Sequence, residues 1–112
     1  MYRGYSVLFV DDEVNILNAL RRGLIDEEYT CYFAISGQQA LRIMEAEKIA
    51  VIVTDMRMPG MDGLALLKEV AAKWPLTVKI VLSGFTQLQQ ILATINQVDI
   101  FKFITKPWKL EE

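Results

Sequence analysis

Histidine is absent from the 112-residue chain, and cysteine occurs once, as Cys31. Without histidine the chain lacks the commonest general base of enzymes and the usual zinc ligand. One cysteine cannot form an intramolecular disulfide, which favours a reducing compartment such as the cytoplasm. No apolar run approaches the roughly 18 residues of a membrane span, and the N-terminus lacks a signal-peptide pattern. Lys and Arg form no cluster of the kind that binds nucleic acid directly.

What the chain does have is a regular order of apolar segments. Its length suits one domain, and a hydrophobic content of 53% is enough for a core. Helical spacing of apolar residues predicts helices, with Ser36 and Asp62 as N-caps of the second and third. The expected helices are 14–25, one beginning after Ser36, 64–73, and one carrying Leu88, Ile91, Leu92 and Ile95. The expected strands are 5–10, 30–35, 49–54, 78–82 and 100–104.

These strands are apolar throughout rather than alternating, which is typical of strands covered on both faces. The sequence therefore predicts a doubly wound α/β fold, with a parallel sheet, helices on each side and right-handed crossovers. Ligands of such sheets bind beyond the carboxyl ends of the strands. Functional residues are accordingly expected where the strands end.

Four of the predicted strands end in polar side chains. Asp11, Asp12 and Glu13 follow the first strand, Asp55 the third, Ser83 the fourth and Lys106 the fifth. If the first and third strands are neighbours, at least three carboxylates meet, and each charge raises the cost of ionising the others. Mg²⁺ would relieve this repulsion, since it prefers oxygen ligands and keeps open positions for a phosphate. A carboxylate nucleophile, a metal, an ammonium and a hydroxyl suit a phosphoryl group.

Each piece alone has a simpler explanation. Acids near a helix start are often only solvated and favourably placed near its positive end. A single Asp before a loop is usually a turn or cap residue, and Lys-Pro is a common loop dipeptide. Their joint placement at the ends of four strands is what favours the phosphoryl site.

With these residues at the strand ends, the chain resembles a receiver domain of two-component response regulators. The resemblance rests on Asp11-Asp12, Asp55, the loop MRMPGMDG (56–63), Ser83-Gly84 and FITKP (103–107), and it spans essentially the whole chain. It implies a flavodoxin-like five-stranded sheet with strand order 2-1-3-4-5. It also implies a signalling module that assists its own phosphorylation and dephosphorylation without being a separate enzyme.

The resemblance assigns roles around the acids. Asp55 would accept a phosphoryl group from the phosphohistidine of a sensor histidine kinase or phosphotransfer protein. Asp12, Asp55 and the backbone carbonyl of Arg57 would bind Mg²⁺, and Asp11 would act through a metal-bound water. Arg57 is bulky and would lie near the path of a hydrolytic water.

The same resemblance assigns the switch. Lys106 would clamp one phosphoryl oxygen, and Ser83 would hydrogen-bond another and draw its loop inward. Phe103 would follow that loop, although many relatives have Tyr there. The Lys106-Pro107 bond would be cis, a conformation accessible at X-Pro for about 0.5–1 kcal/mol.

The end of the chain departs from the family pattern, because only 108–112 remain for the fifth helix, which is little more than one turn. We therefore expect residues 1–112 to be an N-terminal fragment, with an output domain beyond Glu112. The ending FKFITKPW resembles receivers attached to HD-GYP phosphodiesterases or to hydrogenase-type transcriptional activators.

The segment from Ile80 to Val98 contains no Asp, Glu, Lys or Arg. One explanation is a helix whose wet face uses Gln, Thr and Asn. The other is that a partner covers this face, because uncharged polar groups are less costly to desolvate. We expect the surface of 85–96 and 101–103, on the fourth helix and fifth strand, to form a phosphorylation-dependent homodimer or output-domain contact.

Two alternatives remain open to the sequence. The first is a phosphohydrolase with an aspartyl nucleophile. Haloacid-dehalogenase-like enzymes have an acid two residues after the nucleophile, where this chain has Arg57, and they carry cap insertions for which the chain has no room. The second is a receiver-like scaffold that takes no phosphate, against which the complete set of Asp12, Asp55, Ser83 and Lys106 argues.

Overall fold

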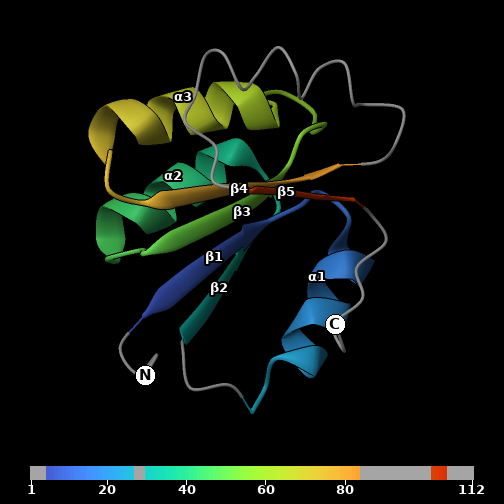
Figure 1. Ribbon diagram of the computed structural model, residues 1–112. Coiled ribbons are helices and arrows are strands. Elements are labelled where there is room, and N and C mark those ends of the chain that lie inside the picture. Colours follow the sequence, from blue (N-terminus) through green and yellow to red (C-terminus); the bar gives the residue numbers. More distant parts are fainter. Residues whose placement is uncertain (1–4, 27–29, 84–101, 106–112) are drawn as a thin grey trace.

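The computed structural model in Figure 1 describes residues 5–26, 30–83 and 102–105, with side chains up to residue 82. Within these residues the chain forms one parallel sheet flanked by helices. The strands are β1 (Ser6–Val10), β2 (Thr30–Ala34), β3 (Val51–Asp55), β4 (Val78–Ser83) and β5 (Lys102–Thr105). They are ordered β2-β1-β3-β4-β5, and every neighbouring pair is parallel. The predicted flavodoxin-like fold and its strand order are confirmed.

Among the described residues, three helices cover the two faces of the sheet. They are α1 (Val14–Gly23), α2 (Gly37–Ala46) and α3 (Gly63–Lys73). In Figure 1, α2 and α3 lie on one side of the sheet and α1 lies on the other. Each helix follows a strand and leads to the next parallel strand, which is the doubly wound arrangement that the sequence predicts.

Two of the helices begin at the predicted cap residues. The Ser36 hydroxyl accepts a hydrogen bond of 3.1 Å from the Gln39 amide at the start of α2. Asp62 Oδ1 accepts one of 2.9 Å from the Ala65 amide at the start of α3. These bonds satisfy amides that have no partner within the helix, and so they fix where each helix begins.

The core is divided by the sheet into two clusters. Leu8, Ile52 and Val81 point toward α2 and α3, where they pack with residues such as Leu66. Their chain neighbours Phe9, Val53 and Leu82 pack on the other face with Leu17 and Leu20 of α1. Adjacent residues of a strand point to opposite faces, so burial on both faces requires the continuous apolar runs seen in the sequence.

The apolar stripe of α1 is shorter than its spacing predicts. Leu17 and Leu20 are buried, but Val14 in the first turn is 53% exposed and Ile25 lies past the end of the helix. Arg21, which shares the stripe, stays exposed and places its guanidinium 4.5 Å from the centre of the Phe33 ring. A cation over an aromatic face takes the place of an aliphatic contact there.

Several expectations lie outside the described residues. These are the helix expected around 88–95, the truncated final helix after Pro107, and most of the uncharged surface. Among the residues that are described, no helix is both long enough and apolar enough to cross a membrane.

Two leucines provide a test of the core. Leu66 is fully buried against the sheet, whereas Leu76 in the α3–β4 connection is 95% exposed. We expect Leu66→Ala to lower the free energy of unfolding by about 2–5 kcal/mol, since it leaves a cavity. Leu76→Ala should change it by less than about 0.5 kcal/mol. Urea unfolding of both variants checks this, and equal effects would contradict the placement of α3.

Candidate functional site

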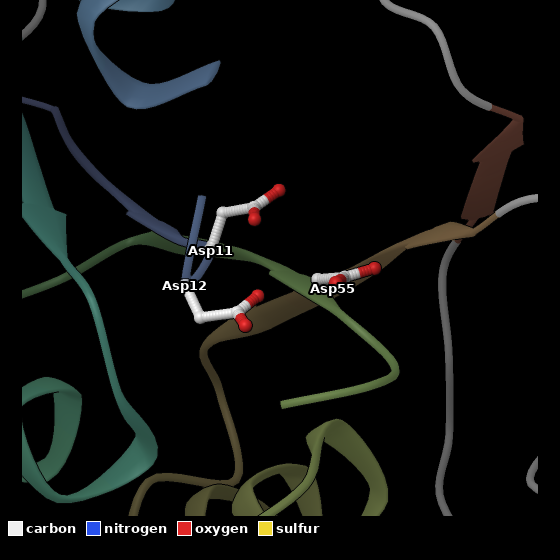
Figure 2. A group of neighbouring side chains, drawn as sticks. All are labelled: Asp11, Asp12 and Asp55. Atoms are coloured by element: carbon white, nitrogen blue, oxygen red, sulfur yellow. The ribbon is translucent and has the colours of Figure 1, made fainter. Parts of the chain in front are cut away.

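The sheet brings three aspartates to one edge. Val10 at the end of β1 pairs with Thr54, so that Asp11 and Asp12 leave β1 beside Asp55, the last residue of β3. Parallel strands end at the same edge, which is why residues 43 and 44 positions apart in the sequence become neighbours. Figure 2 shows the three side chains side by side at the ends of their strands.

The three carboxylates are close enough to share a cation. One oxygen from each of Asp11, Asp12 and Asp55 lies within 4.8 Å of the other two. Asp11 is 2% exposed and Asp55 is 5% exposed, whereas Asp12 faces solvent. The cluster is thus closed on the protein side and open on the solvent side. Oxygen donors in this number suit a hard divalent ion such as Mg²⁺, which also retains water ligands.

Asp11 has a structural contact as well. Its Oδ1 atom accepts a hydrogen bond of 2.9 Å from the Glu13 amide. Glu13 is the N-cap residue of α1, and its own side chain makes no capping bond. The Asp11 carboxylate therefore fixes the turn from β1 into α1. Asp11 thus has a local structural role in addition to its place in the cluster, and at 2% exposure it is not simply a solvated acid near a helix start.

The loop after Asp55 alternates between buried and exposed residues. Met56 and Met58 are buried in the core beneath it, whereas Arg57 between them is exposed. Gly60 has φ of 75°, a conformation that favours glycine. The Gly63 amide donates a hydrogen bond of 2.9 Å to the Met56 carbonyl and ties the start of α3 to the start of the loop.

The switch residues can be placed only in part. Leu82 pairs with Asp55, so Ser83 at the end of β4 lies at the same sheet edge as the aspartates. Ser83 pairs with Thr105, the last residue of β5, and Phe103 pairs with Val81 further back. Lys106 and Pro107 lie outside the described residues, and no side chain is described for Ser83 or Phe103.

Two residues near the aspartates were not singled out from the sequence. Thr54 is fully buried and its hydroxyl donates a hydrogen bond of 3.0 Å to the Asp55 carbonyl. Gly63 lies against the same peptide, since a Cβ atom there would come 2.3 Å from the Asp55 oxygen. Thr54 could have been noticed in the sequence as a threonine within an apolar strand. The role of Gly63 becomes visible only from the distance between α3 and β3.

Lys79 is also buried, but it lies at the opposite end of β4 from the aspartates. Its Nζ atom donates a hydrogen bond of 2.9 Å to the Thr77 carbonyl. Lys79 stands near the start of β4, at the end opposite to Ser83. We therefore assign Lys79 to the packing at the amino-terminal ends of the strands.

Comparison with known proteins places this geometry in a family. Residues 7–112 match the family described as the response regulator receiver domain. A hydrogenase transcriptional regulatory protein, HoxA of Cupriavidus necator, is 43% identical over 92% of this chain. The DNA-binding transcriptional regulator NtrC of Escherichia coli is 33% identical over the whole chain. The chain spans only 21% and 24% of these two proteins.

A solved structure agrees with the sequence matches. The signal receiver domain of an HD domain-containing protein from Pseudomonas fluorescens superposes with a TM-score of 0.91 and is 31% identical. The alignment covers 97% of this chain and 87% of that one. Family, sequence relatives and fold agree over nearly all of the chain, which therefore belongs to the response regulator receiver domains.

Proposed function

We propose that the chain is a phosphorylation-switched signalling module whose phosphoacceptor is Asp55. The observation that carries the proposal is the cluster of Asp11, Asp12 and Asp55, with ligand atoms within 4.8 Å of one another at the carboxyl edge of the sheet. The donor would be the phosphohistidine of a sensor histidine kinase or phosphotransfer protein. Membership of the receiver family supports this, since receivers act in two-component signalling.

In the proposed reaction an Asp55 carboxylate oxygen attacks the phosphorus atom. The bond between phosphorus and the donor imidazole breaks, and the nitrogen leaves with the electron pair. The product is an acyl phosphate on Asp55. Because the side chain of Asp55 is almost fully buried, the strand and the loop determine the direction from which a donor reaches it.

Mg²⁺ would neutralise charge on the phosphoryl oxygens. We assign Asp12, Asp55 and the backbone carbonyl of Arg57 as its direct ligands. Asp11, whose Oδ1 atom already accepts a hydrogen bond from the Glu13 amide, would act through a metal-bound water. Lys106 and Ser83 would contact two further phosphoryl oxygens, and Phe103 would follow the movement of Ser83. The position of Ser83 at the same edge as Asp55 supports this part.

The receiver would regulate a separate output domain. Two relatives are transcriptional regulators of which this chain spans about a fifth to a quarter. We propose that the chain belongs to such a regulator in the cytoplasm, with an output domain following Glu112. HoxA at 43% identity favours a hydrogenase-type transcriptional activator over an HD-type phosphodiesterase. Residues 85–96 and 101–103, which the sequence predicts to lie in a fourth helix and the fifth strand, would form the homodimer or output contact.

We propose no separate enzyme activity for the receiver. An aspartyl phosphohydrolase of the haloacid-dehalogenase kind would need an acid where Arg57 stands, and Arg57 is an exposed base. The proposed chemistry has two steps at one carboxylate. Asp55 first attacks the phosphorus atom of the donor, and water later attacks the phosphorus atom of the acyl phosphate and releases the Asp55 carboxylate.

Acetyl phosphate with Mg²⁺ should label Asp55. The clustered acids would hold the ion and Asp55 would supply the nucleophile, so intact-mass analysis should show one phosphoryl adduct. Asp55→Asn removes the nucleophile and should remove the adduct.

Asp62→Asn is the matched control, since Asp62 is an exposed aspartate that caps α3 and asparagine can cap it too. This variant should be labelled like the parent. An adduct of equal yield in Asp55→Asn would remove Asp55 from its proposed role.

Asp12→Ala should weaken Mg²⁺ binding and stabilise the ion-free protein. It removes one metal ligand and one of three crowded negative charges. We expect the melting temperature without Mg²⁺ to rise by roughly 2–5 °C and the stabilisation by Mg²⁺ to shrink. Thermal melts with and without MgCl₂ measure both effects.

Asp26→Ala is the control, because Asp26 is an exposed aspartate beyond the far end of α1. Its response to Mg²⁺ should equal that of the parent. If Asp12→Ala also keeps the full stabilisation by Mg²⁺, Asp12 is not a ligand.

A further inference from the structure

The two peptides that follow Asp55 are each held by one hydrogen bond from a neighbouring group. On the strand side, the Thr54 hydroxyl donates a 3.0 Å hydrogen bond to the Asp55 carbonyl, and Thr54 has no solvent exposure. On the helix side, the Gly63 amide donates a 2.9 Å hydrogen bond to the Met56 carbonyl. Both bonds act on the backbone that carries the proposed nucleophile.

Gly63 also sets how closely α3 approaches this peptide. An ideal Cβ at Gly63 would lie 2.3 Å from the Asp55 oxygen and 2.8 Å from the Met56 Cα atom, closer than real Cβ contacts. The obstacle is backbone on both counts. The helix cannot easily retreat, because Leu66 and Leu67 in its first two turns are fully buried. A side chain at Gly63 must therefore displace the Asp55–Met56 peptide.

We infer that Thr54 and Gly63 are positioning residues for the phosphoacceptor site. By fixing the Asp55–Met56 and Met56–Arg57 peptides, they set the position of the Asp55 carboxylate and of the Arg57 carbonyl that follows. Mg²⁺ demands near-ideal octahedral geometry, so its affinity is sensitive to small displacements of these ligands. The inference rests on the proposed function, in which Asp55 and Arg57 both bind the ion.

The arrangement has a reciprocal effect. If the Gly63–Met56 hydrogen bond favours ion binding, then ion binding must favour that hydrogen bond by the same free energy. Mg²⁺ should therefore slow hydrogen exchange at the Gly63 amide, although Gly63 is not a ligand. This readout uses the parent sequence and is independent of any substitution.

Two substitutions test the inference on the protein itself. Gly63→Ala adds the obstructing Cβ, and Thr54→Val removes the hydroxyl while keeping the branched shape. Each should weaken Mg²⁺ binding by about tenfold or more, as changes in groups that orient metal ligands do. Isothermal titration with MgCl₂ gives the affinity, and urea unfolding verifies that the variants are folded at the titration temperature.

Two further variants are matched controls. Gly37 also opens a helix, but a Cβ there would meet the flexible Met61 side chain, so Gly37→Ala should bind Mg²⁺ like the parent. Thr54→Ser keeps the hydroxyl and should restore most of the affinity that Thr54→Val loses. Rescue by serine separates the hydrogen bond from simple loss of packing, since serine lacks the methyl group.

The outcomes distinguish this inference from the function on which it rests. If the parent binds Mg²⁺ and folded Gly63→Ala and Thr54→Val bind it equally well, the inference is overturned and the proposed function stands. If the parent neither binds Mg²⁺ nor accepts phosphate, the proposed function fails and the inference fails with it. If Gly63→Ala does not fold, the test rests on two other measurements: the Mg²⁺ affinity of Thr54→Val and hydrogen exchange at the Gly63 amide of the parent. The inference is rejected if Thr54→Val binds Mg²⁺ like the parent and if Mg²⁺ does not change the exchange rate.

Discussion

Parallel pairing of β1 with β3 is the contact on which the candidate site depends. It puts Asp11 and Asp12 beside Asp55. A displacement of one residue in this register would turn the side chains of a strand to the opposite face. Burial of Leu8 and Ile52 on one face and of Phe9 and Val53 on the other opposes such a displacement. The apolar core thus sustains an arrangement of charges that repel one another.

The backbone at this sheet edge is held by contacts from two elements, β3 and α3. Asp11 and Asp12 directly follow β1 and Asp55 ends β3, while Thr54 and Gly63 hold the two peptides after Asp55. Ser83 ends β4 at the same edge, beside the end of β3. The proposed nucleophile thus stands on backbone that is fixed by strand pairing, by the Thr54 hydroxyl and by the start of α3.

Most of the fold could be predicted from the sequence because its signals are local or periodic. Continuous apolar runs identified the strands, and Ser36 and Asp62 marked the helix starts within one residue. The exposure of Val14 could not be predicted, since spacing alone does not say where a helix first reaches the sheet. Placing the aspartates together required strand order, which came from the family resemblance. The roles of Thr54 and Gly63 depend on distances between elements that no local pattern encodes.

The methionines beneath the loop after Asp55 have a consequence for its mechanics. Met56 and Met58 fill the space under the loop, and Met61 lies against Gly37. Thioether side chains are unbranched and polarisable, with more rotatable bonds than leucine or valine. They can follow a small shift of the loop without opening a void, whereas branched side chains would leave one. The support under the loop after Asp55 is therefore compliant, although the two peptides at its start are held firmly.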